Sequence, residues 1–588
     1  QIRKKEAIAY EYYTPENNNK RIPIKDYRRL LKFSDLKTFD ENVKEDASYY
    51  PWDKTFNPTE YYKQYLRLDC LVLKLGLQKF DQLISEITEG KMSIYECLTI
   101  SSLTDRYMKL EGAYDGVYES TGNLRNYIAQ AVYGGRVACN KKYQKKVVKG
   151  PIADFDGVSL YPSAINRLCR ETGLPVGPAQ RFNQNDLVNW ESKTYSILTV
   201  KINKVNKTQQ IPFIAVKSDE SIQYINEAPK EPMIIDSVTL RDWIDFHHIE
   251  FELLDGVFWN EGGNPRMGEV IQRLFSHRLR IKKTNVALAN TIKLMLNSAY
   301  GKTIIKKTNT EKVMVKTHKW SNKEGKWDKF ENQNLHDYIY NNFNTIQDFR
   351  QLNEHTYEIQ RLKADRSYNR GQIGCAILSY SKRIMNEVFD VANDHNLPIY
   401  YTDTDSLHCN LPDVEKIEKL YYQKYQKNLV GKQLEQFHTD FKIQNPNKTH
   451  DDEAEIYATE SLFLGKKSYM DKLITKDKKG NDMFGYHIRL KGITEEGLLH
   501  AAKKHNDNKA FKNIKDQMNG YWKLYNHLAE GNEVSFVLNP EDKDNNAKKV
   551  LFDFKDGRVC TKKEFTRTVD FSGIKKPKPK SKPKSKST

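Results

Sequence analysis

The sequence predicts an α+β protein built from several domains. The chain has 588 residues, more than a single hydrophobic core usually holds. Short β-like runs occur between residues 180 and 265, and an uninterrupted helical pattern then extends from Arg266 to Tyr300. A second helical pattern runs from Ile377 to Asn396, and Pro398 separates it from a short apolar strand that begins at Ile399.

The composition is that of a globular protein with a basic surface. Hydrophobic residues make up 38% of the chain and charged residues 29%. The 95 Lys and Arg residues exceed the 77 Asp and Glu residues, so the net charge is +18. Because lysine and arginine displace counterions from phosphates, this excess favours a nucleic-acid partner. A solubility surface or AT-rich coding is the alternative, so charge alone favours nucleic acid only modestly.

The cysteine pattern argues against a zinc site, and the lack of long apolar runs argues against a membrane span. The seven cysteines are scattered and form no CxxC pair, so no zinc site is predicted. Their odd number in a long chain fits a reducing, intracellular compartment. No apolar run approaches about 18 residues, so neither a membrane span nor a membrane partner is predicted.

Both ends of the chain are distinctive. The first residues lack a starting Met and an apolar signal core, and they resemble the middle of a longer protein. The segment from Lys575 to Thr588 carries seven lysines and no acid. Alternating Pro and Lys cannot form a core, so this tail is predicted to be disordered. It would serve in nuclear import, as a DNA tether, or only as a solvated tail. The nucleus, the mitochondrion and a viral or plasmid replication site are all compatible locations.

The first chemical motif is IADFDGVSLYPSAI, residues 152–165. An apolar approach ends at Asp156, and Pro162 is expected to begin a helix as its first residue. A carboxylate at the end of a strand is well placed to hold a hard cation such as Mg²⁺. Alone, Asp156 would also suit an ordinary turn or helix cap.

The second motif is YYTDTDSLHCN, residues 400–410. Asp403 and Asp405 would share one face of a strand or sit at the tip of a hairpin. Two carboxylates this close repel each other unless a cation lies between them. An acidic turn is the alternative, but the flanking residues are strongly β-forming.

The third motif, TIKLMLNSAYGKT (residues 291–303), closes the long helical pattern. Lys293, Asn297 and Tyr300 fall on one helical stripe. Lys282 lies three turns before Lys293 on nearly the same stripe, and Arg278 is close to it. Gly301 is expected to end the helix as its C′ residue. Such a stripe suits a triphosphate and a stacked base, whereas a solvated basic face is the simpler alternative.

A fourth motif, FLGKKSYMDKL (residues 463–473), contains Lys466, Lys467 and Tyr469. Taken in order, the four motifs resemble those of family B DNA polymerases. The matching segments are Asp156–Ser163, Lys293–Gly301, Tyr401–Ser406 and Lys467–Tyr469. The resemblance covers about residues 60 to 500 and is specific because four motifs recur in one order.

This resemblance implies a right-hand polymerase with palm, fingers and thumb, and a partial RNase H-like 3′–5′ exonuclease domain at the N-terminus. Asp156 and Asp405 would hold two Mg²⁺ ions, with Asp403 assisting and Mn²⁺ able to substitute. The implied partners are a DNA template-primer and dNTPs. Tyr161 resembles the steric gate that rejects a ribose 2′-hydroxyl.

The remaining implied contacts divide between nucleotide and DNA. The dNTP site would comprise Lys293, Asn297, Tyr300, Tyr161, Ser159, Leu160, Arg278 and Lys282. The primer and DNA contacts would comprise Lys467, Tyr469, Tyr133, Gly134, Gly135, Ser298 and Gly301. Of these, Tyr133-Gly134-Gly135-Arg136 resembles the YxGG element between exonuclease and polymerase modules, although Tyr133 abuts the glycines directly. A plain tight turn is the alternative for this segment.

The compact layout resembles the protein-primed subgroup of phages, adenoviruses, linear plasmids and Maverick-type elements. A terminal protein is therefore an expected partner. Within the exonuclease region, Tyr65 and Asp69 match a YxxxD motif, but no DxE lies upstream. The exonuclease is thus expected to be incomplete in this chain, most simply because an N-terminal segment is missing. An ordinary amphipathic helix would also explain the YxxxD match.

The predicted domains follow from these motifs. They are the C-terminal part of the exonuclease (1–125), palm (126–180), an insertion at the position of terminal-protein region 1 (181–265), fingers (266–303), an insertion at the position of terminal region 2 (304–370), palm (371–470), thumb (471–568) and a disordered basic tail (569–588). The two insertions are assigned by position and not by residue matches.

Other classes explain the motifs less well. A reverse transcriptase would carry YxDD in place of YTDTDS, and a single-subunit RNA polymerase lacks the SLYPS and NSxYG elements. A non-catalytic DNA-binding relic would have lost a carboxylate, whereas all three are present. A conventionally primed family B polymerase stays an alternative to protein priming.

Overall fold

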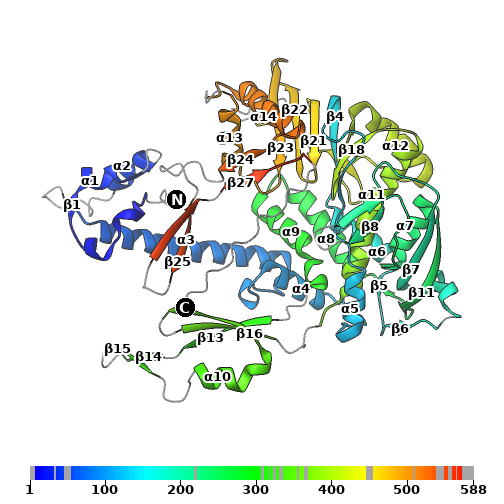
Figure 1. Cartoon of the computed structure of the whole chain (residues 1–588), viewed down its shortest axis with the longest axis horizontal. Coiled ribbons are helices and arrows are strands. Elements are labelled where there is room, and N and C mark those ends of the chain that lie inside the picture. Colours follow the sequence, from blue (N-terminus) through cyan, green and yellow to red (C-terminus); the bar gives the residue numbers. More distant parts are fainter. Residues whose placement is uncertain are drawn as a thin grey trace, which may run out of the picture. The chain divides into compact units, whose positions relative to one another are not determined.

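The chain forms two compact units, one of Gln1–Tyr107 with Leu274–Met295 and one of Met108–Arg273 with Leu296–Thr588 (Figure 1). The computed structural model describes residues 7–31, 35–45, 55–183, 185–217, 222–305, 310–316, 318–321, 326–329, 335–353, 356–362, 368–444, 454–506, 510–537, 548–553, 559–564 and 566–572. The predicted basic tail from Lys575 lies outside these residues. No described helix is both long and apolar enough to cross a membrane.

The first unit is helical and has an aromatic core. Its elements are η1 (Tyr10–Tyr12), η2 (Pro15–Asn17), β1 (Ile22–Pro23), α1 (Ile24–Arg29), α2 (Leu36–Glu45), β2 (Thr55–Phe56), α3 (Pro58–Ile87), η5 (Ile94–Glu96), the start of α4 (Ile100–Leu110), the end of α8 (Arg266–Ile281) and most of α9 (Val286–Ser298). Tyr27, Phe39, Phe56 and Tyr61 are fully buried against one another. Asn57 begins α3, because its side-chain oxygen accepts hydrogen bonds from the first-turn amides.

The second unit is organised around an eight-stranded antiparallel sheet. The strand order is β23-β22-β21-β4-β19-β18-β3, and β20 pairs with β4. The strands are β3 (Val137–Cys139), β4 (Val147–Gly157), β18 (Ile399–Asp403), β19 (Ser406–Asn410), β20 (Phe437–Thr439), β21 (Tyr457–Gly465), β22 (Ser468–Lys476) and β23 (Asp482–Leu490). The central strand β4 therefore joins partners that lie far away in the sequence.

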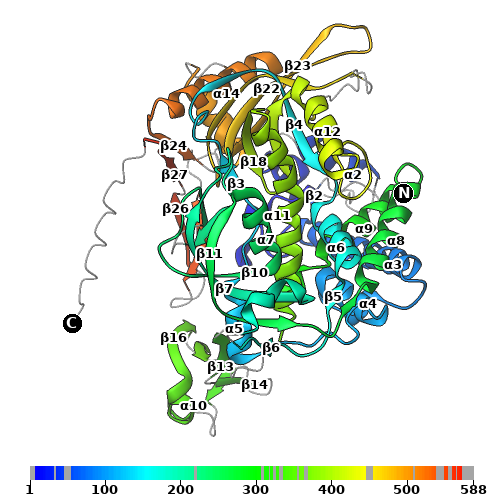
Figure 2. The same cartoon turned by 90° about the vertical axis from the view of Figure 1, so that its right-hand side faces the viewer.

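Three helices pack together beside the middle of this sheet: α6 (Leu160–Glu171), α11 (Gly371–Asp394) and α12 (Leu411–Tyr425) (Figure 2). Helix α11 is buried along almost its whole length, including the charged residues Lys382, Glu387 and Asp390. Arg167 of α6 donates to Glu387 of α11 at 2.5 and 2.8 Å. Tyr421 of α12 donates to the same carboxylate at 3.0 Å. This buried group links all three helices.

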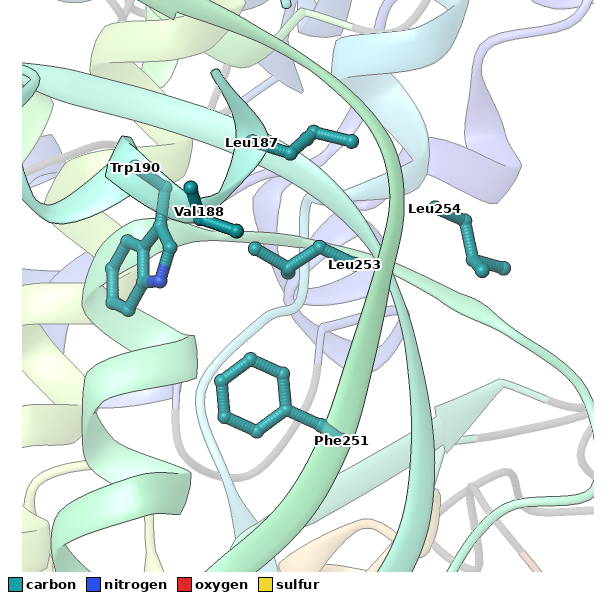
Figure 3. Close-up of a pocket in the computed structure, with 6 residues that line it drawn as sticks. All are labelled: Leu187, Val188, Trp190, Phe251, Leu253 and Leu254. Atoms are coloured by element: carbon teal, nitrogen blue, oxygen red, sulfur yellow. The ribbon is translucent and has the colours of Figure 1, made fainter. Parts of the chain in front are cut away.

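A second antiparallel sheet forms within residues 180–265, where the sequence predicted β-like runs. Its strand order is β10-β7-β11-β6, and β8 pairs with β9. The elements are β6 (Gln180–Arg181), η6 (Leu187–Ser192), β7 (Tyr195–Val205), β8 (Ile214–Lys217), β9 (Ile222–Ile225), β10 (Met233–Asp236), α7 (Ser237–His247) and β11 (Ile249–Trp259). An apolar pocket of about 520 Å³ lies between η6 and β11 (Figure 3).

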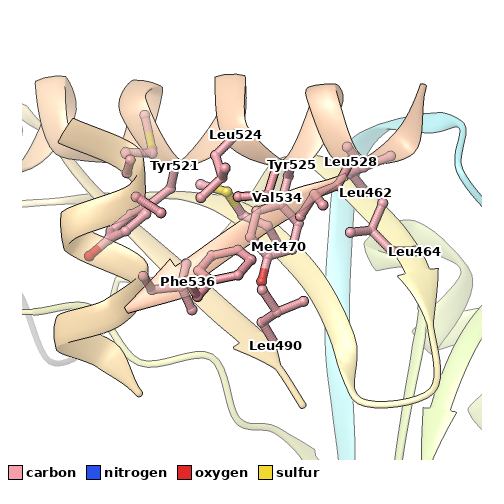
Figure 4. Packing of buried hydrophobic residues seen from close by; sticks show 14 residues of the cluster. Leu462, Leu464, Met470, Leu490, Tyr521, Leu524, Tyr525, Leu528, Val534 and Phe536 are labelled. Carbon is pink, nitrogen blue, oxygen red and sulfur yellow. The ribbon is translucent and has the colours of Figure 1, made fainter. Parts of the chain in front are cut away.

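The C-terminal part of the second unit has its own apolar core (Figure 4). Helices α13 (Glu495–Lys504) and α14 (Ile514–Ala529) pack with β21–β23, β24 (Val534–Val537) and β27 (Thr566–Val569). Tyr521, Leu524, Tyr525 and Leu528 recur every three or four residues, which gives α14 one apolar face. That face meets Leu462, Met470 and neighbouring side chains of the sheet.

The remaining described elements lie mostly within residues 304–370. They are β5 (Leu174–Pro175), β12 (Gly263–Asn264), α5 (Gly122–Gln130), β13 (Thr310–Lys316), β14 (His318–Ser321), β15 (Lys326–Lys329), α10 (Leu335–Asn342), η8 (Phe343–Thr345), β16 (Ile346–Asn353), β17 (Thr356–Leu362), β25 (Lys548–Asp553) and β26 (Val559–Glu564). Strands β13, β17 and β16 form one sheet.

The predicted helix from Arg266 to Tyr300 is wrong as a single element. It divides into α8 (Arg266–Ile281) and α9 (Val286–Ser298). Asn285 starts the second helix, because its side-chain oxygen accepts from the Leu288 amide at 3.1 Å. Lys282 lies in the connecting turn, so the predicted stripe from Lys282 to Lys293 does not form. Gly301 is not a C′ residue but the start of η7 (Gly301–Ile304).

Candidate active site

A tight turn between β18 and β19 brings Asp403 and Asp405 beside Asp156. Asp403 ends β18, and Ser406, which begins β19, pairs with Asp156 of β4. Thr404 adopts a left-handed backbone with φ 68°. The Gly157 amide donates to the Asp405 carbonyl at 2.7 Å, which ties the turn to the end of β4. The hairpin tip predicted from YTDTDS is confirmed.

The electrostatics of this turn favour a bound cation. Burial, reinforced by the negative charge of Asp405, raises the pKa of Asp156 to about 8. Burial, with repulsion from Asp403, raises the pKa of Asp405 to about 6. Carboxylate oxygens are the ligands that Mg²⁺ prefers. The residues present therefore fit a hard divalent cation, which would stabilise their ionised forms.

Lys467 neutralises the third carboxylate. Its ammonium group lies 2.7 and 2.9 Å from the two oxygens of Asp403. Its backbone amide donates to the Tyr401 hydroxyl at 2.9 Å. Tyr469, predicted beside it as a primer contact, is only 5% exposed, and its ring packs 4.7 Å from that of Tyr401. Lys467 is thus exposed near the carboxylates. Tyr469 instead lies in the core and packs against Tyr401, on the strand that ends at Asp403.

The Tyr133-Gly134-Gly135 segment passes directly over the acidic turn. A Cβ atom on Gly135 would lie 2.5 Å from the Thr404 methyl group, whereas one on Gly134 would meet nothing within 4 Å. The Thr404 amide donates to the Arg136 carbonyl at 2.7 Å. Tyr133 is buried, and its carbonyl accepts from the Lys382 ammonium at 2.8 Å. This segment is therefore in contact with the acidic turn, and close approach explains Gly135.

Arg136 is a supporting residue that the motif analysis did not single out. Its buried guanidinium lies 4.7 Å from the ring centroids of both Phe213 and Phe389. It donates to the Asn386 side chain at 2.7 Å. Burial lowers the pKa of Arg136 to about 10, so it stays charged at neutral pH. The only signal in the sequence was a basic residue directly after the two glycines.

The SLYPS segment begins α6 two residues earlier than predicted. Ser159 is the N-cap in a left-handed conformation with φ 48°, and Leu160 is the first helical residue. Pro162 is therefore third, not first, where its missing amide is still not needed. The buried Leu160 side chain anchors this turn. The turn directs Tyr161 toward Tyr300, and the two rings stack with centroids 4.3 Å apart.

The other predicted nucleotide-binding residues lie on α8 and α9 or just after them. Arg278, Lys282 and Lys293 belong to the first compact unit, and Lys293 is exposed. Burial lowers the pKa of Arg278. The residues that follow belong to the second unit: Asn297, Ser298, Tyr300 and Gly301. Asn297 is exposed and Tyr300 half-buried.

The predicted exonuclease residues lie on α3 in the first unit. The hydroxyl oxygens of Tyr65 and Tyr10 are 3.4 Å apart. Hydrogen bonding to Tyr10 and to Asp69 raises the pKa of Tyr65. Tyr65 and Asp69 therefore interact across one helical turn, as their spacing predicts.

Comparison with known proteins decides the family. Residues 3–390 match the family described as DNA polymerase type B, organellar and viral. The chain belongs to this family. A DNA polymerase of Kluyveromyces lactis is 23% identical over 461 residues, which are 76% of this chain and 41% of that protein. A DNA polymerase of Trichoplusia ni ascovirus 2c is 29% identical over 112 residues, 19% of this chain and 10% of that one. The type B chain thus spans less than half the length of these curated relatives.

Solved structures confirm the fold of this type B chain. Phi29 DNA polymerase with primer-template DNA superposes with a TM-score of 0.52 at 15% identity, covering 88% of this chain and 74% of that one. Its complex with primer-template DNA and incoming nucleotides gives a TM-score of 0.51 at 16% identity, with the same coverage. The predicted α+β right-hand polymerase fold is therefore confirmed.

Proposed function

We propose that this chain is a DNA-directed DNA polymerase that adds dNMPs to a 3′-hydroxyl by two-metal phosphoryl transfer. The observation that carries the proposal is the convergence of Asp156, Asp403 and Asp405 where β4 ends and the chain turns from β18 to β19. Burial raises the pKa of Asp156, and the charge of Asp405 adds to this, so the site needs positive charge. Membership of the type B polymerases supports the same reaction.

Asp156 and Asp405 would hold two Mg²⁺ ions, or Mn²⁺ in their place, and Asp403 would assist. Such ions supply activation of the primer hydroxyl and charge stabilisation of the departing pyrophosphate. The chain itself contributes the fixed positions of the carboxylates. The Gly157–Asp405 and Thr404–Arg136 backbone hydrogen bonds hold the turn that presents them.

The dNTP would lie against Tyr161 and Tyr300. The stacked rings support a wall that excludes a 2′-hydroxyl, and Ser159 and Leu160 fix the turn behind it. By resemblance, Asn297 would line the nascent base pair. By the same resemblance, Lys293 and Lys282 would bind the triphosphate through their compact ammonium charges, and Arg278 through its planar guanidinium.

Lys467 would exchange its partner when DNA binds. In the free protein it pairs with Asp403, and 53% of its side chain is exposed. A primer phosphate could replace that carboxylate, and Asp403 would then be free to assist the metal site. Ser298, Gly301 and the Tyr133–Gly135 segment are further DNA contacts proposed from resemblance.

Protein priming is the proposed mode of initiation, with a terminal protein as partner. Its structural support is the apolar pocket in the 181–265 segment, lined by Leu187, Val188, Trp190, Phe251, Leu253 and Leu254 (Figure 3). Val188 is 76% exposed and Leu254 44%. An exposed apolar pocket of this kind suits a protein surface better than DNA.

Primer extension tests the polymerase proposal. With Mg²⁺ and dNTPs, the wild type should extend a primed template, and Asp405→Asn should be slower by at least about 10³-fold. Asp482→Asn is the matched control, because Asp482 is an ion-paired carboxylate on β23. Equal extension by wild type and Asp405→Asn would refute the assignment.

Priming needs a separate assay, the transfer of labelled dNMP onto a candidate terminal protein. Leu254→Lys should reduce this transfer but leave DNA-primed extension unchanged. Tyr422→Lys, an exposed aromatic position on α12, serves as control. Normal primer extension without any transfer would indicate a conventionally primed polymerase.

Proofreading is tested with single-stranded 3′ ends. Asp69→Ala should abolish any degradation by the full-length protein, because Tyr65 and Asp69 are proposed to act in the exonuclease. Equal degradation by both proteins would remove Asp69 from that role.

A further inference from the structure

Four titratable side chains of the large sheet lie close together, in a group separate from the carboxylates of the β18–β19 turn. They come from four strands: Asp154 from β4, His408 from β19, Asp471 from β22 and His487 from β23. Asp154 is the direct cross-strand partner of His408, and Asp471 is that of His487. His408 and Asp471 are completely buried. Such a group must be compensated by protons or by an ion.

The distances between these side chains are too long for good charged hydrogen bonds. His408 Nδ1 lies 3.6 Å from Asp154 Oδ1, and its Nε2 lies 3.4 Å from Asp471 Oδ2. His487 Nδ1 lies 3.4 Å from the same Asp471 oxygen. Charged hydrogen bonds are normally about 2.7–2.9 Å long.

Buried atoms of this group lack hydrogen-bond partners. Asp154 Oδ1, His408 Nδ1 and His487 Nδ1 have none among the residues that the structure describes. The side chain of His408 is 0% exposed, so its Nδ1 cannot be satisfied by bulk water. An acceptor oxygen and a ring nitrogen therefore lie 3.6 Å apart without a hydrogen bond, and both are atoms that can bind a cation.

We propose that Asp154, His408 and His487 form a second metal site, for a divalent cation of the zinc class. One ligand atom from each residue lies within 4.8 Å of the others. Zinc bonds of about 2.0–2.1 Å in a tetrahedron place neighbouring ligand atoms about 3.4 Å apart, so a small closure would complete the site. Imidazole nitrogens select zinc over Mg²⁺, which prefers oxygen ligands.

Asp471 is the positioning residue of this site. It faces His408 Nε2, so that the opposite nitrogen, Nδ1, is presented to Asp154. Its other oxygen accepts from the Ser461 hydroxyl at 2.6 Å. A carboxylate that orients a metal-binding histidine through the second ring nitrogen is the usual support of protein zinc sites.

A cation at this site would stabilise the position of β4, the strand that carries Asp156. Asp154 and Asp156 are two residues apart on β4 and so point to the same face. A cation held by Asp154, His408 and His487 would fasten β4 and β19 to β23 at the far edge of the sheet. It would also neutralise Asp154, one of the acids whose charge acts on Asp156. The site contains no cysteine, which is why the absence of CxxC pairs did not reveal it.

Metal analysis of the full chain tests the proposal. After zinc loading and dialysis against Mg²⁺, mass spectrometry should find about one zinc per chain, in wild type and in Asp405→Asn alike. His487→Gln should lower the zinc content at least tenfold. His487 is chosen because its side chain is 22% exposed, so its replacement disturbs the core least. His395→Gln, at an exposed histidine after α11, is the control that should keep its zinc.

Asp471→Asn provides a second, independent variant and should weaken zinc binding by about 10–100-fold. X-ray absorption at the zinc edge should show two imidazole ligands in the wild type. Zinc below about one tenth per chain in the loaded wild type, or unchanged zinc in His487→Gln, would overturn the proposal in favour of a proton-sharing network. Zinc content is measured without primer extension, so this result is independent of the polymerase proposal.

Discussion

The phenol rings of Tyr161 and Tyr300 stack with their centroids 4.3 Å apart and their planes inclined by 25°. Tyr161 lies in the first turn of α6, and Tyr300 follows α9. Each ring restrains the rotation of the other. An aromatic pair of this kind contributes about 0.5–1.5 kcal/mol of stability beyond that from burial of its surface.

Replacing Tyr161 by Ala should therefore relax sugar selection. We expect the ratio of kcat/KM for a ribonucleotide to that for the deoxynucleotide to rise on the order of 10²-fold. Tyr161→Phe keeps the ring and should stay within a few-fold of wild type. Single-nucleotide incorporation with paired rNTP and dNTP substrates measures the ratio. An unchanged ratio in Tyr161→Ala would exclude this ring as the gate.

The carboxylates of Asp156 and Asp405 should make the metal-free protein less stable as the pH rises. Burial, with the charge of Asp405, raises the pKa of Asp156 to about 8, and burial raises that of Asp405 to about 6. Unfolded carboxyls ionise near about pH 4. The folded state thus binds extra protons. The stabilisation that these protons give the folded state is fully present below about pH 4. It is lost as the pH rises through about 6, where Asp405 ionises, and about 8, where Asp156 ionises.

Thermal melts in EDTA should show this as a Tm that falls between about pH 5 and 8. Mg²⁺ should flatten the trend, because it displaces the protons when it binds. Asp156→Asn should remove most of the slope. If wild type and Asp156→Asn melt with the same pH dependence in EDTA, Asp156 is not the group responsible.

Lys467 should matter for DNA binding and little for stability. Its ion pair with Asp403 is half-exposed, and such pairs contribute about 0–1 kcal/mol. Loss of one phosphate contact in Lys467→Ala should reduce the slope of log K against log salt by about 1. Fluorescence anisotropy with a primed template at several salt concentrations measures the slope. Lys466→Ala is the neighbouring control, since that ammonium binds the Ile222 carbonyl. Equal slopes for both variants would contradict the assignment.

Gly135→Ala should impair catalysis while the fold survives. The added methyl would meet the Thr404 side chain at 2.5 Å and push on the turn that carries Asp403 and Asp405. A shift of about 1 Å in a catalytic group costs on the order of 10²-fold in rate. Gly76→Ala, on α3, is a matched control, because its methyl meets nothing within 4 Å and Gly76 is not among the proposed DNA contacts. Comparable kcat values for the two variants, at equal Tm, would show that the turn tolerates the contact.

The buried pair of Arg167 and Glu387 should be sensitive to the loss of one partner. Arg167→Met leaves the buried Glu387 carboxylate with the Tyr421 hydroxyl and with Arg383, whose guanidinium is 4.0 Å away. Loss of the short Arg167 pair should lower the free energy of unfolding by about 3–5 kcal/mol. The double change with Glu387→Met should recover much of the loss, because no unpaired charge is left. Urea denaturation measures both. A double variant no more stable than the single one would mean that the pair is net stabilising.

Sequence reasoning succeeded where a local pattern determines the structure. The YTDTDS hairpin, the strand at Ile399 and the helix beginning near Ile377 follow from periodicity and β-forming flanks, although α11 begins earlier, at Gly371. It failed where the conformation or hydrogen bond of a single residue decides. The Asn285 cap divides the long helix, and the left-handed Ser159 starts α6 before Pro162.

Long-range packing could not be predicted from the sequence. Nothing near Arg136 indicates that Phe213, Phe389 and Asn386 surround it. The same holds for the approach of Gly135 to Thr404, which joins segments that no local pattern connects. The close assembly of Asp154, His408 and His487 likewise depends on which strands become neighbours.

The strand order of the large sheet has a consequence for how the chain is made. Arg167 pairs with Glu387, 220 residues later in the sequence, and Gln144 bonds to Leu464, 320 residues later. Closing such distant contacts is slow, because loop entropy is lost before the contacts form. During synthesis, the second sheet around β7 and β11 can fold while β4 still lacks β19 and β21. The part of the sheet around Asp156 is therefore completed late in synthesis. A chain truncated before β21 would hold Asp156 on an incomplete sheet.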